Sequence, residues 1–144
     1  MTTIAYRNGV MAGDGRETQI AEGESALIIR DTDRKVFRLK DGRLFGAAKI
    51  SEDILRLYNS LKNGTPLPKL EDVNAILVDL KRRIWFNEGR IWQRGPYKFF
   101  AIGSGAGFAI AAMHAGATAI EAVRIAIKCD PYSGGRVSHV RLRQ

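Results

Sequence analysis

The chain has 144 residues, about the length of one domain, and 45% of them are hydrophobic and 26% charged. This composition excludes a disordered or fibrous protein, and a single cysteine excludes both an internal disulfide and a zinc site built from several cysteines. The net charge of +8 raises nucleic acid or a membrane surface as partners. However, the excess is spread as +2 over residues 1–49, +3 over 50–100 and +3 over 101–144, with no basic arm. We therefore expect neither nucleic acid nor a membrane as a partner.

The first half of the chain predicts two hairpins and a helix. Residues 3–13 place Asn8-Gly9 between two short apolar runs, and residues 36–45 place Asp41-Gly42 in the same way. Such dipeptides between strand-like runs are strong hairpin signals. A helix is then predicted to begin at Ser51, with acidic residues in its first turn, and to end at Asn63-Gly64 before a proline-containing loop.

The second half predicts strands and then helices. Apolar runs indicate strands at residues 75–78, 84–86, 91–92 and 99–102, and a small-residue helix follows through residues 108–115. Thr118 and Glu121 form the sequence pattern of a capping box, so a further helix is expected to run from there to Asp130-Pro131, before a last strand near residues 137–140. This order favours two antiparallel sheets stacked face to face, with helices outside.

Thr2 is the first candidate for chemistry. If Met1 is removed, Thr2 carries a hydroxyl and a free α-amine on one residue. An α-amine titrates at a pH of about 7.7–8, so it can accept the hydroxyl proton near neutral pH without a histidine. The plainer interpretation is that a threonine at position 2 only permits removal of the initiator methionine.

Further polar residues could support a nucleophile at Thr2. Asp14 follows the first predicted hairpin and Lys35 begins the second. A lysine beside a hydroxyl lowers the pKa of that hydroxyl, and a buried aspartate keeps the lysine charged. Two hydroxyls and a carboxylate that could orient the amine follow later, in the segments 103–105 and 130–135. Taken singly, each of these residues is also an ordinary turn, cap or surface residue.

Read together, these segments resemble the proteasome β-subunit family of N-terminal nucleophile hydrolases, and most of all the bacterial HslV-type peptidases. Six pieces of the chain carry the resemblance, in the family's order and at similar spacing: residues 2–4, 12–15, 34–36, 44–46, 101–105 and 130–135. The resemblance implies an α+β fold, a four-layer αββα sandwich, formed by one peptidase domain over residues 1–144.

The resemblance also implies roles for individual residues. Thr2 would be the nucleophile, with its own amine as general base; Lys35 would tune it, and Asp14 would pair with Lys35. The amide of Gly46 would stabilise the oxyanion of the transition state. The polar network around the amine would consist of Ser104, Asp130 and Ser133. No cofactor would be needed for the chemistry, although a structural monovalent cation would bind the main-chain carbonyls of Cys129, Tyr132 and Gly135.

The sequence departs from the HslV pattern in three places. The second hairpin is slightly shorter between Lys35 and Gly46, which makes Ala47 a rival for the oxyanion position. Lys49 stands where a small glycine is expected. Residues 51–70 offer one helix and a proline-containing loop where the family has a long helical pair facing an ATPase ring. This shortened helical region predicts that an ATPase unfoldase docks differently or is absent.

The leading hypothesis is a cytoplasmic threonine-type endopeptidase that hydrolyses unfolded polypeptides inside a homo-oligomer of stacked rings. The cytoplasmic location is expected because no apolar leader follows Met1 and the single cysteine suits a reducing compartment. Two alternatives stay open. One is a catalytically silent ring subunit with the same fold, and the other, prompted only by the charge, is a basic nucleic-acid-binding domain.

Overall fold

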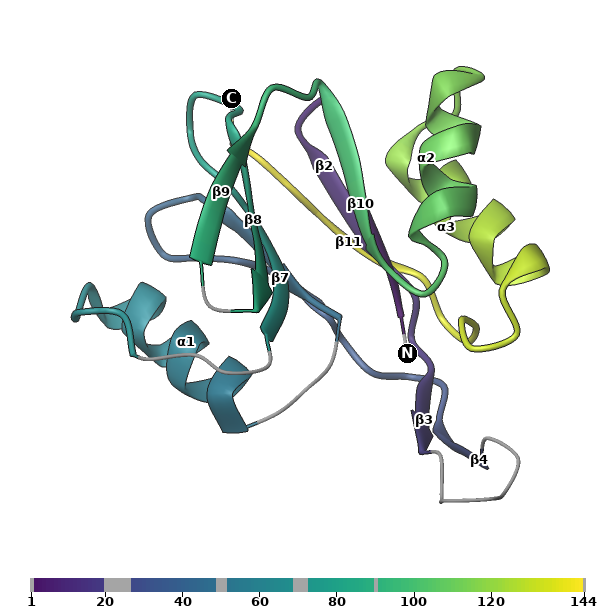
Figure 1. Ribbon diagram of the computed structural model, residues 1–144, viewed down its shortest axis with the longest axis horizontal. Coiled ribbons are helices and arrows are strands. Elements are labelled where there is room, and N and C mark those ends of the chain that lie inside the picture. The colour runs from purple at the N-terminus through teal and green to yellow at the C-terminus, as the bar shows by residue number, and fades with distance from the viewer. Residues whose placement is uncertain (1, 20–26, 49–51, 69–72, 90, 144) are drawn as a thin grey trace.

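The protein is an α+β structure with two larger antiparallel sheets, a short third sheet and three helices in its described part (Figure 1). The computed structural model describes residues 2–19, 27–48, 52–68, 73–89 and 91–143. All strand pairings in these residues are antiparallel. This agrees with the sheet type expected from the sequence.

The first sheet has the strand order β10-β1-β2-β11. Its strands are β1 (Thr3–Arg7), β2 (Val10–Gly13), β10 (Phe99–Gly103) and β11 (Ser138–Arg141). The predicted turn between β1 and β2 is confirmed, with φ of 50° at Asn8 and 79° at Gly9. Because both residues lie in the left-handed region, they form the kind of tight turn that matches the twist of a hairpin.

The second sheet has the strand order β5-β6-β7-β8-β9. Its strands are β5 (Val36–Arg38), β6 (Leu44–Ala47), β7 (Val73–Val78), β8 (Ile84–Gly89) and β9 (Ile91–Gly95). The hairpin predicted at Asp41-Gly42 joins β5 to β6, and Gly42 has a φ of 97°. Val36 pairs with Gly46, which fixes Lys35 at the start of the hairpin next to Ala47.

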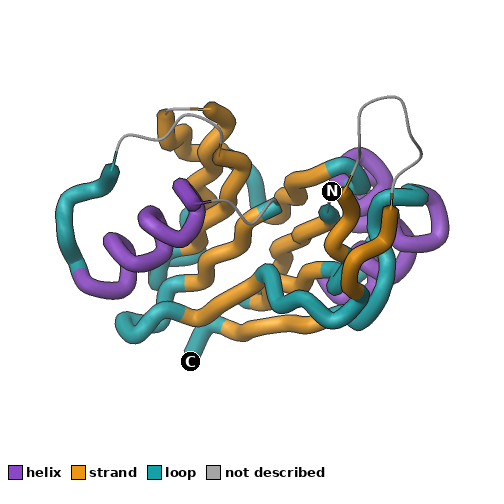
Figure 2. Tube along the Cα trace, turned by 90° about the horizontal axis from the view of Figure 1, so that it is seen from below, coloured by secondary structure: helices purple, strands orange, loops and turns teal. Residues whose placement is uncertain are grey.

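Helices pack on both sheets. Helix α1 (Glu52–Asn63) buries Ile54, Leu57 and Leu61 in an apolar cluster with side chains of the five-stranded sheet. Helices α2 (Ala106–His114) and α3 (Ala119–Cys129) pack through alanines on Ala5, Ala12 and Ala101 of the four-stranded sheet. The small side chains allow these helices to lie close to the strands. Figure 2 shows helices on the two outer sides with the strands between them.

A third apolar cluster joins the two sheets. Ile4, Tyr6 and Met11 of the first sheet share this cluster with residues of the second, which are Val36, Leu44, Ile76, Val78 and Ile84. Alternate residues of β1 therefore serve different layers: Ile4 and Tyr6 face the other sheet, whereas Ala5 faces the helices. This alternation fixes the register of β1 and, with it, the position of Thr2 at its beginning.

The structure adds one element that the sequence pattern did not predict. Strands β3 (Glu17–Gln19) and β4 (Leu27–Arg30) form a separate two-stranded sheet beside the beginning of β1 (Figure 1). Residues 51–70, the helical region that the sequence predicts to be shorter than in HslV-type peptidases, contain α1 among their described residues. This helix is followed by Gly64, with a φ of 66°, and by an irregular segment to residue 68. Ser51 and Lys49 lie outside the described residues. No helix of the described chain is long and apolar enough to span a membrane.

Candidate active site

The fold brings Thr2, Asp14 and Lys35 into direct contact. Lys35 Nζ donates a hydrogen bond to Thr2 Oγ1 over 2.7 Å and to Asp14 Oδ1 over 3.0 Å. All three side chains are buried: Thr2 is 1% exposed, Asp14 0% and Lys35 4%. Thr2 precedes β1, Asp14 follows β2 and Lys35 precedes β5, so the contact joins the ends of two hairpins. The grouping predicted from the sequence is present in the structure.

Lys35 has a third acceptor, the main-chain carbonyl of Arg16, at 2.5 Å from Nζ. An ammonium group carries three N–H donors and no acceptor, so only the charged form can donate to Thr2, Asp14 and Arg16 together. Burial lowers the pKa of Lys35 from its usual 10.5, and the charge of Asp14 and its hydrogen bond oppose this effect. Asp14 therefore keeps a positive charge next to the hydroxyl of Thr2.

Asp14 is itself fixed by the main chain. Its Oδ1 accepts from the amide of Thr3 at 3.0 Å, and its Oδ2 accepts from the amide of Gly134 at 3.0 Å and that of Arg16 at 3.4 Å. With Lys35 added, both carboxylate oxygens have two donors each. A carboxylate that is buried but fully bonded has little freedom to move. Asp14 thus ties the beginning of β1 to the turn near Gly134.

Ser104, Asp130 and Ser133 form a second polar group next to Thr2 and Thr3. Asp130 Oδ2 accepts from Ser104 Oγ and from Ser133 Oγ, both over 2.6 Å. Ser104 Oγ also lies 3.4 Å from the carbonyl oxygen of Thr2, and Ser133 Oγ lies 2.7 Å from Thr3 Oγ1. Burial raises the pKa of Asp130, but the hydrogen bonds from Ser104, Ser133 and the amide of Tyr132 act in the opposite direction, and the net effect is a lowered pKa. Asp130 is accordingly held as a carboxylate beside residues 2 and 3.

Two glycines allow this close approach. At Gly103, φ is 96°, and a Cβ there would overlap the carbonyl of Thr2. At Gly105, a Cβ would overlap Thr3 Oγ1. The sequence segment Gly103-Ser104-Gly105 is therefore required by the packing of the chain against residues 2 and 3. It presents Ser104 between two positions that have no room for a side chain.

The structure places Gly46 and Ala47, the two candidate oxyanion donors, within the ladder of β6. The amide of Ala47 donates to the carbonyl of Lys35 at 3.1 Å. Because amides of a strand point alternately to its two neighbours, the amide of Gly46 points toward β7, where its register partner is Ile76. In this pairing both amides are directed into the sheet. The oxyanion role of Gly46 stays a prediction.

Arg16 and Asp31 belong to the site but were not found from the sequence. The guanidinium of Arg16 binds the carboxylate of Asp31 through Nε at 2.9 Å and Nη2 at 3.3 Å. Side chains at Gly134 and Gly135 would collide with Arg16 and Asp31, respectively. The ion pair thus packs directly on this turn and fixes the carbonyl that Lys35 binds. A main-chain acceptor has no sequence signal of its own.

The carbonyls predicted to bind a monovalent cation belong to the segment that ends α3 and the turn after it. The carbonyls of Cys129, Tyr132 and Gly135 accept none of the backbone hydrogen bonds that the described residues form outside helices and strands. Main-chain carbonyl oxygens are the ligand type that hard cations prefer, so the residues fit the predicted group. The cation stays a prediction. In the described residues, no cluster of at least three His, Cys, Asp or Glu side chains could hold a metal ion.

Comparison with solved structures identifies the fold. The chain is similar to the eukaryotic HslV from Trypanosoma brucei, with a TM-score of 0.70 and 20% identity over 99% of each chain. It is also similar to Thiobacillus denitrificans BPH, with a TM-score of 0.63 and 18% identity over 99% of this chain and 98% of that one. The structure of that BPH in complex with epoxomicin gives a TM-score of 0.59 and 19% identity over 99% of each chain.

No protein-family model matches the sequence, and no curated protein matches it either. The likeness to solved structures nevertheless extends over nearly the full length of both chains. It includes the segments that suggested the resemblance, from Thr2 to the turn after α3. The chain therefore has the fold of the proteasome-like peptidase HslV, as its sequence motifs predicted.

Proposed function

We propose that the protein is a threonine-type endopeptidase whose nucleophile is Thr2 after removal of Met1. One observation carries the proposal: the charged Lys35, paired with buried Asp14, donates a 2.7 Å hydrogen bond to Thr2 Oγ1. A buried cation next to a hydroxyl favours the alkoxide over the neutral alcohol and so lowers the pKa of that hydroxyl. The arrangement activates an oxygen nucleophile at the beginning of β1.

The proton of Thr2 Oγ1 would go to the α-amine of the same residue. Lys35 cannot accept it while its three N–H donors are bound to Thr2, Asp14 and the carbonyl of Arg16. A free α-amine has a pKa of about 7.7–8, which suits a general base near neutral pH. The oxygen would then attack a peptide carbonyl to form an acyl-enzyme, and the protonated amine would donate its proton to the leaving amine. Water would release the acyl group in the second step.

The group of Ser104, Asp130 and Ser133 supports this assignment. The three side chains hold the carbonyl of Thr2 and the hydroxyl of Thr3, so they fix the backbone from which the amine projects. We propose that the negative Asp130 also stabilises the protonated form of that amine during the reaction. This role is electrostatic and positioning; the bond-forming oxygen belongs to Thr2.

We further propose that the chain folds as a four-layer αββα sandwich and assembles into a homo-oligomer of stacked rings. This oligomer would act on unfolded polypeptides in the cytoplasm. The three apolar clusters support the layers: one lies between the sheets and one on the outer face of each. The single described helix on the five-stranded sheet supports a reduced or different surface for an ATPase ring.

The test compares Thr2→Ala and Thr2→Ser with the unmodified chain. Hydrolysis of a fluorogenic peptide should be abolished in Thr2→Ala and retained at a lower rate in Thr2→Ser, because serine keeps the hydroxyl and the amine. Intact-mass spectrometry should show that Met1 is absent from the active protein, and size-exclusion chromatography should show the same oligomer in all three. Unchanged hydrolysis by Thr2→Ala would exclude the mechanism.

The alternative of a catalytically silent subunit is distinguished by the same measurements. In a silent subunit Met1 would remain attached, so the amine of Thr2 would be part of a peptide bond and could not act as a base. A threonine-reactive peptide electrophile should add its mass to the active protein but not to Thr2→Ala. A purified protein that retains Met1 and takes up no label would favour the silent subunit.

A further inference from the structure

Basic side chains gather at the end of the first sheet that lies opposite Thr2. Thr2 precedes β1, whereas the Asn8-Gly9 turn follows it, so the two ends are about 17 Å apart for a five-residue strand. Two cavities lie on either side of this turn, one lined by Asn8 and one next to Gly9. The fold thus brings basic residues from distant parts of the sequence to this end of the sheet.

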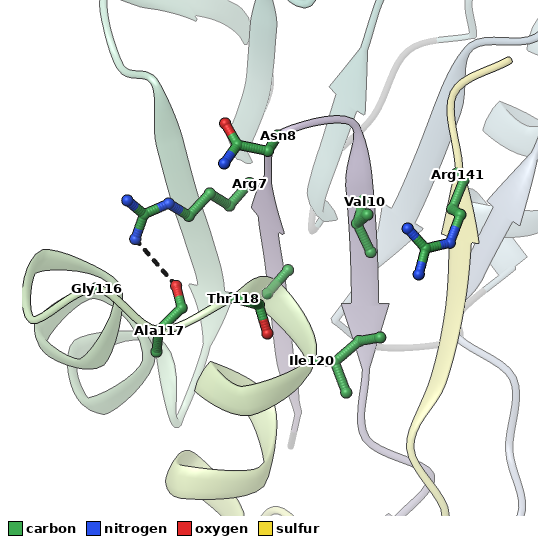
Figure 3. A pocket seen from close by; sticks show the side chains of 9 residues that line it. Arg7, Asn8, Val10, Gly116, Ala117, Thr118, Ile120 and Arg141 are labelled. Atoms are coloured by element: carbon green, nitrogen blue, oxygen red, sulfur yellow. Dashed lines mark hydrogen bonds between the residues drawn. The ribbon is translucent and has the colours of Figure 1, made fainter. Parts of the chain in front are cut away.

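The first cavity has a volume of about 350 Å³ and lies between the β1–β2 turn, β11 and the turn that joins α2 to α3 (Figure 3). Arg7 and Arg141 stand on opposite sides of it, with Val10 and Ile120 between them. Arg7 Nη1 donates to the carbonyl of Ala117 at 2.9 Å, and the guanidinium lies 5.0 Å from the centre of the Phe99 ring. Arg7 is therefore held in place at this side of the cavity, and its Nη1 also donates to the carbonyl of Met113.

The second cavity has a volume of about 310 Å³ and lies between the turn at Gly42, the turn at Leu80 and the segment after β11. Its cationic residues are Lys40, Arg82 and Arg143. Arg82 lies beside Gly9, and the amide of Leu142 donates to the carbonyl of Gly9 at 2.8 Å, so the turn joins the two cavities. Leu80, which is 62% exposed, and Leu142 provide apolar walls.

These cations are not neutralised within the described residues. None of the five basic residues that line the two cavities forms an ion pair with a described carboxylate; these residues are Arg7, Lys40, Arg82, Arg141 and Arg143. Asp41 lines the second cavity but binds Arg43 at 2.6 Å. Nearby Asp79 likewise binds Arg83 at 2.6 Å. The surface thus presents five positive charges that are available to anions from outside the chain.

We propose that this surface binds an acidic polypeptide segment in which carboxylates alternate with aliphatic side chains. Guanidinium and ammonium groups at the rims fit carboxylates, and the walls formed by Val10, Ile120, Leu80 and Leu142 fit aliphatic side chains. The residues lining the two cavities include no aromatic side chain on which a base could stack. This favours an acidic peptide over a single-stranded nucleic acid. The site lies at the far end of β1 and is separate from Thr2.

The test measures fluorescence anisotropy with the full chain and a short labelled peptide in which glutamate alternates with leucine. The peptide should bind, and the double variant Arg141→Gln/Arg143→Gln should bind about tenfold more weakly, since each exposed ion pair contributes roughly threefold. A peptide with glutamine in place of every glutamate should lose binding. Hydrolysis of a standard fluorogenic peptide should stay unchanged in the double variant. Mass spectrometry of the recovered peptide separates binding from cleavage.

The matched control is Lys62→Gln/Lys128→Gln, which removes the same charge from exposed helical positions on α1 and α3. This variant should bind the acidic peptide as the unmodified chain does. An equal loss in both double variants would mean attraction by net charge alone and would overturn the proposal. So would tighter binding of a labelled single-stranded oligonucleotide than of the peptide, or an acidic peptide that does not bind.

Discussion

Replacing Asp14 by asparagine should destabilise the protein by removing the counterion of a buried lysine. The side chain of Asp14 is fully buried, and its carboxylate accepts from Lys35 Nζ and from the amides of Thr3, Arg16 and Gly134. Asparagine keeps the shape but turns one oxygen into a donor that faces other donors. Removing one partner of a buried ion pair costs about 3–5 kcal/mol. Since a domain has only about 5–15 kcal/mol of stability, this loss is a large fraction of the free energy of unfolding.

The measurement is urea unfolding followed by the fluorescence of Trp85 and Trp92. The exposed pair Asp41–Arg43 provides the control, and Asp41→Asn should lower the free energy of unfolding by no more than about 1 kcal/mol. The double variant Asp14→Asn/Lys35→Met removes both charges. The decrease in the free energy of unfolding of this double variant should be smaller, by about 1–3 kcal/mol, than the sum of the decreases in the two single variants. Additive single losses would refute the inference that the pair acts as a unit.

Three further predictions test other parts of the site and fold. Because the pKa of Asp130 is lowered by folding, its carboxylate stabilises the folded protein at a pH above about 3.9, the pKa of an aspartate in the unfolded chain, and this stabilisation is lost as the pH falls. In urea unfolding between about pH 6 and pH 2, the free energy of unfolding should therefore decrease less in Asp130→Asn than in the unmodified chain. Gly105→Ala should reduce the rate of peptide hydrolysis at least about tenfold because the added Cβ displaces Thr3. The control Gly107→Ala should leave this rate unchanged because a Cβ at that position meets no atom within 4 Å. Thr118→Ala should lower the unfolding free energy by about 1 kcal/mol, which calorimetry would show as a melting temperature about 3 °C lower.

Local signals predicted the elements whose structure depends on local chemistry. The left-handed turn at Asn8-Gly9 and the capping box of Thr118 and Glu121 both formed as their residue types indicated. The strands β3 and β4 were missed because this part of the chain has no tight-turn dipeptide, and their pairing includes an irregular register between Glu17 and Thr18. Their position depends on contacts that a sequence pattern does not contain.

The candidate site could be predicted only in part. The order of the motifs pointed to Thr2, Asp14 and Lys35, and the structure brings them together. The third acceptor of Lys35 is a main-chain carbonyl, which every residue has, so no pattern could single out Arg16. The amides of Gly46 and Ala47 are directed by the pairing of β6 with its two neighbours, which is a long-range property of the sheet.

The distribution of the site along the chain sets when it can form during translation. Asp14 accepts from the amide of Gly134, and Thr3 Oγ1 lies 2.7 Å from Ser133 Oγ, so groups encoded more than a hundred codons apart complete one site. When the ribosome has synthesised only the first half of the chain, Thr2 and Lys35 are present, but residues 130–135, which pack against Thr3 and Asp14, are not. The hydroxyl of Thr2 therefore acquires its surroundings late in synthesis, when nearly the whole chain has emerged from the exit tunnel.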